Sequence, residues 1–434
     1  MSNKVRDGLV LFSIAFFLYN INLRPIATGD SVPAALIPIA LLTKGNMAMD
    51  EFNQHYIDYY QRRDGYRQET PKPYFFVATK YGYLSPYPIA TGLILTPFYA
   101  VPVYVYNQMH PTTAQWVFFA VVAEKISASA ITAASVALFY LLCLKVGASR
   151  AMSLLLAAAY AFTTEAWVIS SQALWQHGPG VFFILSSCLI ALDHKEYPSV
   201  RKAVLIGLLC AVAVAIRPTN IIFCISLLLW TVAMRASYWL WCAIPVAAIA
   251  SALGAYNIAI FGNVRGGYTM PFNADFLEGF SGILFSPGRG LLIYFPLALF
   301  GLAGYYRGLR ERHAAAGFFT VLMISALLQI ILFSKWPTWW GGYCYGPRYL
   351  TEIQPMLLLA AIPLFRQRQN DLLARAVFIV FFVWSFSIQA VGAFLYPAGD
   401  WNGSPINVDN ALSRVWDWKD NPVARDITAF LKKQ

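Results

Sequence analysis

Long apolar runs constrain this chain more than any other feature of its sequence. The runs are roughly 18 to 22 residues long, the length that an α-helix needs to cross ~30 Å of hydrocarbon. Of the 434 residues, 58% are hydrophobic and only 12% are charged, whereas a soluble domain carries about 25% charged residues. The pattern therefore predicts an all-α polytopic membrane protein. It excludes a cytoplasmic enzyme, a secreted domain and a disordered regulator.

Basic residues lie in the short connections between the apolar runs. The net charge of +11 is therefore explained by the positive-inside bias of membrane proteins, and no nucleic-acid partner is predicted. Lys4 and Arg6 precede the first run, which predicts a cytoplasmic N-terminus. Alternation of the connections predicts about 11 transmembrane helices. The expected spans are residues 8–25, 124–144, 151–169, 181–192, 203–216, 221–234, 240–261, 291–305, 318–333, 350–364 and 376–395.

The connection after the first span is long and polar and covers residues 26–123. Within it, residues 87–106 are moderately apolar but contain Pro97 and Pro102, which disfavour a regular span. Counting this piece as a span would invert every later connection and place most basic residues on the wrong side. We therefore expect a first extracytoplasmic loop with interfacial or partly re-entrant helices. The chain is predicted to be one membrane domain, residues 1–395, followed by a short extracytoplasmic tail, residues 396–434.

Asp30 is the first acidic residue after the first span. Gly29 before it permits a tight turn, and Pro33 after it can begin a helix. This position places a carboxylate at the outer membrane face, where a general base could take a proton from an acceptor hydroxyl. The alternative is a helix N-cap or a solvated loop acid.

The densest group of aromatic and cationic residues is the segment 335–350. Its members include Lys335, Trp339, Trp340, Tyr343, Tyr345 and Arg348. Arg348 stands where the next span begins, at headgroup depth, where a guanidinium binds phosphate in a bidentate manner. Together these side chains suit a ligand with a sugar, a phosphate and a long apolar tail. The alternative is an aromatic belt at the membrane interface.

Other outer connections carry further candidates. Arg265 and Arg289 lie in glycine-rich turns, which can wrap an anionic group with backbone N–H and guanidinium groups. In the segment 175–179, Trp175 could stack on a sugar face, and His177 could bind a phosphate or donate to a sugar hydroxyl. The alternative for this pair is an interface belt with a capping histidine.

The remaining charged residues are weaker candidates. Asp50 and Glu51 could supply a second catalytic or metal-binding carboxylate, although adjacent loop acids are usually solvated or begin a helix. Arg217 lies between two spans with almost no loop, so it needs either a lipid phosphate or an internal carboxylate as partner. Glu124 and Lys125 are expected to neutralise each other. No cysteine or histidine spacing predicts a metal site.

Several of these motifs resemble those of bacterial GT-C-type polytopic membrane glycosyltransferases, similar to the protein-mannosyltransferase and aminoarabinose-transferase group. The motifs are Gly29-Asp30 and the segments 175–179, 217–220, 286–290 and 339–350. The resemblance runs over most of residues 1–365. It implies a polyprenyl-phosphate sugar donor and an inverting transfer to a glycan, lipid or protein acceptor. The implied setting is the bacterial inner (plasma) membrane, with the active site facing the periplasm or exterior.

On this resemblance, Asp30 matches the acid of the first outer loop that acts as general base. Arg348 is the best match for a residue that binds the donor phosphate, followed by Arg289, Arg265 and Lys335. No cofactor is required, and a divalent metal is compatible with the chemistry but not indicated. Transfer of this kind requires Asp30 and Arg348 to converge on one cavity.

Two other functions fit the sequence less well. A transporter or flippase of a lipid-linked sugar would also need aromatic and cationic groups. It would normally place polar groups and broken helices near the bilayer midplane, whereas here the polar groups crowd the outer ends of the spans. A non-catalytic assembly subunit would not need Asp30.

Overall fold

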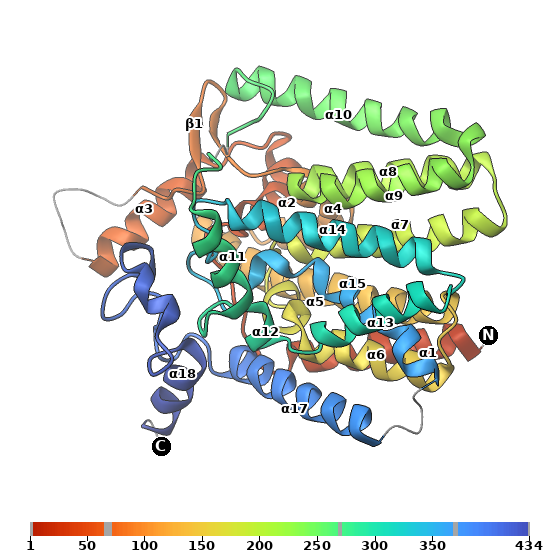
Figure 1. Ribbon diagram of the computed structural model, residues 1–434. Coiled ribbons are helices and arrows are strands. Elements are labelled where there is room, and N and C mark those ends of the chain that lie inside the picture. The colour runs from red at the N-terminus through yellow and green to blue at the C-terminus, as the bar shows by residue number, and fades with distance from the viewer. Residues whose placement is uncertain (1–2, 65–71, 268–270, 368–371, 433–434) are drawn as a thin grey trace.

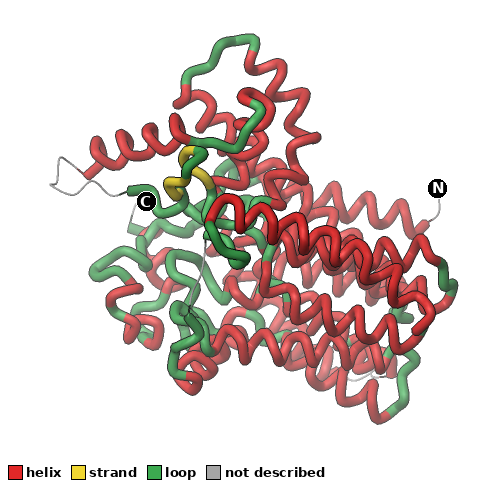
Figure 2. The backbone as a smooth tube through the Cα atoms, turned by 90° about the horizontal axis from the view of Figure 1, so that it is seen from above, coloured by secondary structure: helices red, strands yellow, loops and turns green. Residues whose placement is uncertain are grey.

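The computed structural model describes residues 3–64, 72–267, 271–367 and 372–432. Roughly parallel helices form a bundle, and shorter helices and loops form a cap at one end of it (Figure 1). The N-terminus lies at the opposite end from the cap, and the C-terminus lies beside the cap. Seen along the perpendicular view, nearly all of the described chain is helix or loop (Figure 2).

Within the described ranges, twelve helices make up the bundle. Their bounds are α1 Asn3–Asn20, α5 Thr113–Lys145, α6 Arg150–Thr163, α7 His177–Glu196, α8 Val200–Ile216, α9 Ile221–Met234, α10 Trp239–Phe261, α13 Ala298–Arg310, α14 Ala316–Ser334, α15 Ile353–Ala360, α16 Ile362–Gln367 and α17 Leu372–Phe394. Helix α5 packs on α1, α6 and α7, α8 lies between α7 and α10, and α15 is covered by α13 and α14. Serine side chains cap the N-termini of two of these helices. The Ser149 hydroxyl caps α6, and the Ser199 hydroxyl caps α8.

Among the residues that the structure describes, four helices are long and apolar enough to cross a membrane. They are Thr113–Lys145, Ala236–Phe261, Ala316–Ser334 and Leu372–Phe394. Shorter apolar helices of 10–17 residues accompany them. These features agree with an all-α membrane protein, but they do not confirm the predicted number of about 11 spans.

Three of the predicted spans are interrupted helices. Residues 151–169 comprise most of α6 and a π-helical turn, Ala166–Ser170, with a bend at Thr164 between them. Residues 291–305 comprise α12, Leu291–Tyr294, and the first part of α13, with Pro296 between them. Residues 350–364 comprise α15 and the start of α16, with Pro363 in the first turn of α16. Proline lacks the N–H that would continue the helical hydrogen bonds. The apolar runs therefore predicted correctly that these residues are buried. They did not predict that the helices are interrupted.

Residues 26–123 form most of the cap. Their elements are α2 Val32–Lys44, α3 Asp50–Asp64, β1 Val77–Thr79, β2 Gly82–Leu84 and α4 Ala90–Asn107. Strands β1 and β2 pair as an antiparallel hairpin with Val77 opposite Leu84. Helix α4 packs on α2 and continues through Pro97 and Pro102. A helix is therefore present in this part of the loop, as predicted, and it continues although each proline removes one helical hydrogen bond.

The basic connections meet at the end of the bundle away from the cap. Lys145 Nζ lies 3.3 Å from Asp193, and Lys202 Nζ lies 2.5 Å from the same carboxylate. Arg150 Nε lies 2.6 Å from Asp7 of α1. These ion pairs tie together connections that are distant in sequence, so the basic residues share one end, as the charge pattern predicts.

The C-terminal segment is an integral part of the cap end. Beyond α17 it contains short 3-10 turns and α18, Pro422–Leu431. Trp401, Val408 and Val415 are buried in the main apolar core, and the Gly288 N–H donates to the Val415 carbonyl at 3.1 Å. In the same region α11, Phe276–Phe285, is capped by the Asp275 side chain. The predicted tail is therefore packed against the domain that precedes it.

Candidate functional site

Asp30 and Arg348 form an ion pair at the cap end, although 318 residues separate them in sequence. Arg348 Nη1 lies 3.0 Å from Asp30 Oδ2. Asp30 Oδ1 accepts hydrogen bonds from the Tyr87 hydroxyl at 2.9 Å and the Tyr74 hydroxyl at 3.3 Å. Burial, together with the Asp30 charge, raises the pKa of Tyr74, so this phenol remains a donor. The expectation that Asp30 and Arg348 converge is thus confirmed.

The backbone around Asp30 explains why a glycine precedes it. A Cβ atom at Gly29 would lie 2.4 Å from the Phe75 ring, so no larger residue fits there without a shift. Ser31 occupies the N-cap position of α2, and Pro33 stands in its first turn. Asp30 therefore lies on the loop directly before α2, with 27% of its side chain exposed.

Arg348 opens a short 3-10 turn and is held between aromatic rings. Its guanidinium carbon lies 4.6 Å from the Trp175 ring centroid and 5.2 Å from the Tyr349 ring centroid. Such cation–π contacts hold the charged guanidinium against the faces of the two rings. The Arg348 Nε has no hydrogen-bond partner within the described ranges, so the guanidinium keeps capacity for an added acceptor.

A second ionic cluster adjoins the first. Glu352 is completely buried, and its Oε1 lies 2.5 Å from Arg217 Nη1 and 3.1 Å from His177 Nδ1. The Arg217 guanidinium carbon lies 5.1 Å from the Phe333 ring centroid and 5.9 Å from that of Tyr349. Of the two partners predicted for Arg217, the structure shows the internal carboxylate.

Both clusters border one cavity of about 320 Å³. This volume lies at the lower end of the range for small-molecule sites. The cavity is lined by Asp30, Pro86, Tyr87, Pro88, Ile89, Trp175, Gln176, His177, Val214, Ala215, Arg217, Pro218, Thr219, Leu253, Tyr256, Asn257, Phe261, Arg265, Gly266, Phe333, Trp336, Arg348 and Tyr349. Charged, hydroxyl and aromatic side chains thus surround one small space.

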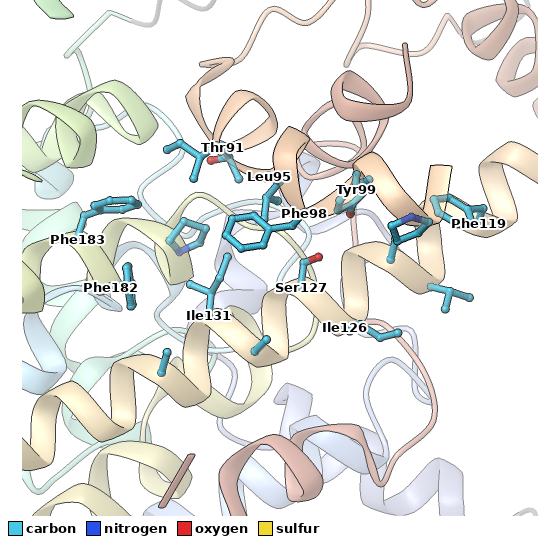
Figure 3. Close-up of a pocket in the computed structure, with 17 residues that line it drawn as sticks. Thr91, Leu95, Phe98, Tyr99, Phe119, Ile126, Ser127, Ile131, Phe182 and Phe183 are labelled. Atoms are coloured by element: carbon cyan, nitrogen blue, oxygen red, sulfur yellow. The ribbon is translucent and has the colours of Figure 1, made fainter. Parts of the chain in front are cut away.

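An apolar groove of about 600 Å³ lies between α4, α5 and α7. Leu95 and Phe98 of α4 and Ile131 of α5 project toward it, with Phe182 and Phe183 of α7 at one end (Figure 3). Among the residues that line it, none is charged. The groove therefore suits hydrocarbon rather than a polar ligand.

The groove and the cavity adjoin the same small apolar cluster. Ile94 and Phe183 line the groove, Ala215 and Leu253 line the cavity, and all four belong to this cluster. The two spaces have no lining residue in common and are linked through this packed cluster.

Arg289 does not have the position that the sequence predicts for it. Its side chain is fully buried, with Nε donating to the Trp340 carbonyl at 2.7 Å and Nη2 donating to Asn402 Oδ1 at 2.6 Å. Further donations reach the carbonyls of Gly288 and Gly342. These bonds hold the 340–342 backbone against the C-terminal segment. A role for Arg289 on the donor phosphate is therefore not supported.

The aromatic segment 335–350 divides into two parts. Trp336 and Tyr349 line the cavity, but Trp339, Trp340, Tyr343 and Tyr345 do not. The Tyr345 hydroxyl donates to the Ile388 carbonyl at 2.8 Å, and Trp340 Nε1 donates to Asp409 at 2.7 Å. Trp339 is buried, and Tyr343 is 41% exposed. The predicted sugar pocket of these four residues is therefore corrected: they lie outside the cavity, and two of them anchor the loop.

The remaining predicted binding residues differ in whether they line the cavity. Arg265 lines the cavity as an exposed residue. Lys335 follows α14 and does not line the cavity. Trp175 and His177 both line it, and Trp175 Nε1 also donates to the Ile26 carbonyl at 3.1 Å.

The other acidic candidates lie outside the cavity. Asp50 begins α3 and accepts from the Tyr83 N–H at 3.3 Å. Glu51 pairs with Lys44 at 2.8 Å. Neither Asp50 nor Glu51 lines the cavity, so a second catalytic carboxylate at these positions is not supported.

Glu124 and Lys125 are buried and have different partners from those expected. Glu124 Oε1 accepts from the Leu174 N–H at 2.9 Å. Lys125 Nζ donates to the Tyr19 carbonyl at 2.7 Å and to Gln172 Oε1 at 2.6 Å. Consecutive residues on a helix point in different directions, which explains why the predicted pairing was wrong.

Sequence reasoning missed several residues of the site. Glu352 could have been found, because an acid inside a predicted span is unusual and needs a partner. Tyr87 and Tyr256 gave no such signal, since tyrosine is common near membrane interfaces. Only the tertiary structure brings their side chains to the cavity.

Within the described ranges, no group of three or more His, Cys, Asp or Glu side chains is placed to hold a metal ion. All six cysteines are free and buried.

Comparison with known proteins gives no match: no family model, no curated protein and no solved structure matches this chain.

Proposed function

We propose that this protein is a membrane glycosyltransferase that moves a sugar from a polyprenyl-phosphate donor to an acceptor hydroxyl. The observation that carries the proposal is the pairing of Asp30 with Arg348, 3.0 Å apart in a cavity beside an apolar groove. A carboxylate can take a proton, and a guanidinium can bind a phosphate. The sequence resemblance to GT-C-type transferases supports the same reaction.

The proposed reaction is a single displacement with inversion. The acceptor oxygen forms a bond to the anomeric carbon as the bond from that carbon to the phosphate oxygen breaks. Asp30 takes the hydroxyl proton, and the polyprenyl phosphate leaves with the electron pair. Arg348, with Arg265 at the cavity, stabilises the charge that grows on this phosphate.

The apolar groove supplies a place for the donor chain. It lies among α4, α5 and α7, and residues of both the groove and the cavity belong to one small apolar cluster. A polyprenyl chain buried there would be removed from water and would fix the position of its phosphate. The cavity itself would hold the phosphate and the sugar.

The proposed setting is the bacterial inner membrane. The basic end of the bundle would face the cytoplasm, and the cap with its cavity would face the periplasm. The acceptor would be a glycan, a lipid or a protein that presents a hydroxyl to this face.

The test uses purified protein in proteoliposomes with a panel of synthetic polyprenyl-phosphate sugars and with membrane and wall fractions as acceptors. Release of free polyprenyl phosphate and labelling of an acceptor are measured together. We expect Asp30→Asn to lower transfer by about 10²–10⁴-fold. Asp58→Asn, which changes an acid of α3 outside the cavity, is the matched control and should retain activity.

Undiminished transfer by a folded Asp30→Asn protein would remove Asp30 as the base. Movement of the intact lipid-linked sugar between leaflets, with no cleavage of its phosphate bond, would instead establish the transporter alternative.

A further inference from the structure

We propose that the Arg217 side of the cavity binds the sugar of the donor and selects a neutral, hydroxyl-rich sugar. The inference rests on the proposed function and names its substrate class. Two features carry it. Arg217 and Arg348, two of the three arginines that line the cavity, are neutralised in different ways, and polar groups of the cavity lack hydrogen-bond partners.

The two carboxylates that neutralise the arginines differ in freedom. Asp30 has 27% of its side chain exposed and lies on a loop, so Arg348 can exchange it for a phosphate. Glu352 is completely buried and contacts both Arg217 and His177. Taking Arg217 away from Glu352 would leave an uncompensated buried charge, which is strongly unfavourable. Arg348 is therefore the phosphate-binding arginine, and Arg217 remains paired.

Apart from the two arginines, three residues that line the cavity carry polar atoms that no described residue satisfies. They are the Thr219 hydroxyl, the Tyr256 hydroxyl and Trp336 Nε1. Buried polar groups are almost always hydrogen-bonded in folded proteins, so these three point to a ligand that supplies the missing partners. Sugar hydroxyls both donate and accept, and they match a hydroxyl, a phenol and an indole N–H alike.

Aromatic rings beside these groups suit the face of a sugar. The rings of Phe333 and Tyr349 are stacked at 4.8 Å with an angle of 13° between them, and Arg217 lies over both. Rings and polar groups side by side are what a carbohydrate requires, because its C–H face is apolar and its edge is polar.

The charges of this region favour a neutral sugar. Arg217 and Glu352 cancel each other, and with the imidazole of His177 in its neutral form the three side chains have no net charge. The carboxylate of a uronic acid on the Arg217 side would meet Arg217, which is already paired with Glu352. The ammonium of an amino sugar would meet only Asp30, the one carboxylate among the described residues of the cavity lining, which the reaction needs free.

The test compares the binding of four synthetic short-chain lipids to the purified full-length protein. They are bare polyprenyl phosphate and the same lipid carrying a neutral hexose, a uronic acid or an amino sugar. We expect the neutral hexose lipid to bind on the order of tenfold more tightly than either charged one. Equal or tighter binding of a charged donor would overturn the inference.

Variants locate the effect within the cavity. Tyr256→Phe and Trp336→Phe should each weaken binding of the hexose lipid roughly two- to tenfold, because each removes one hydrogen bond to the sugar. Binding of bare polyprenyl phosphate should be unchanged. Tyr305→Phe is the matched control, because its hydroxyl bonds Thr320 in the bundle and it lies outside the cavity. If neither Tyr256→Phe nor Trp336→Phe weakens binding of the hexose lipid more than binding of bare polyprenyl phosphate, the sugar does not bind here.

Two further arms separate this inference from the proposed function. Glu352→Gln leaves the Arg217 charge uncancelled, so binding of the uronic acid lipid should gain relative to the hexose lipid; no gain would contradict the role of Glu352. Arg348→Gln should weaken the binding of all four lipids, including bare polyprenyl phosphate. If the wild-type protein binds no polyprenyl phosphate of any kind, the proposed function itself fails.

Discussion

At the scale of single residues, the loop that leads to the site depends on backbone conformations that favour glycine. The loop before Arg348 contains Gly341, Gly342 and Gly346, all with positive φ, a conformation that costs other residues about 1–2 kcal/mol. Gly346 also lies against a buried acid: a Cβ there would lie 2.3 Å from Glu165 Oε1. At Gly342 the nearest atom to such a Cβ is 3.9 Å away.

This contrast gives a stability prediction. Gly342→Ala should lower the free energy of unfolding by about 1–2 kcal/mol through backbone strain alone. Gly346→Ala should cost about 1–3 kcal/mol more, because the methyl group also collides with the packed core. Thermal unfolding of both variants in the same detergent measures the difference. Equal melting temperatures would show that the contact with Glu165 is easily relieved.

At the scale of elements, the C-terminal helix α18 is held by a buried acid. Asp426 is 1% exposed, and its Oδ1 accepts from the Gly399 N–H at 2.7 Å, whereas Oδ2 has no partner among the described residues. Burial raises the Asp426 pKa from 3.8 to about 6. The charges of Arg24 and Arg425 partly oppose this rise, and that of Asp400 adds to it.

The sign of the pH dependence follows from that shift. The packed form of α18 binds the Asp426 proton more tightly than the detached form does, so packing weakens as pH rises from about 4 to about 6 and stays weaker above. Hydrogen exchange of residues 422–431, corrected for the intrinsic rate, should be slower at pH 5 than at pH 7.5. Asp426→Asn should remove the dependence. Faster exchange at the lower pH would contradict the prediction.

At the scale of the whole molecule, the bundle has two chemically different ends. Basic connections tied by Lys145, Arg150 and Lys202 occupy one end, and the cap with Asp30 and Arg348 occupies the other. The proposed orientation puts the basic end in the cytoplasm.

Single-cysteine labelling tests this orientation, and the burial of all six native cysteines lowers the background. Ser413→Cys, exposed at the cap end, should react with a membrane-impermeant maleimide on intact spheroplasts. Arg201→Cys, exposed at the basic end, should react only after permeabilisation. The reverse pattern would place the cavity on the cytoplasmic side and contradict the proposed setting.

The sequence by itself determined the helical membrane class, the gathering of basic connections at one end, and the two residues that meet in the cavity. Each rests on a local property: apolar length, charge placement, or a charged side chain next to a span. The interrupted helices at Pro296 and Pro363 show the limit of this information, because apolar runs report burial rather than helix continuity.

Only the tertiary structure decided which polar side chains belong to the cavity. Arg289 looked like Arg348 in sequence, yet its guanidinium is used by backbone carbonyls and Asn402, while Glu352 emerged as the partner of Arg217. The physical reason is that a buried charge takes its role from the partners around it. Those partners come from other segments of the chain, such as Asn402, which is 113 residues from Arg289, so no local pattern encodes them.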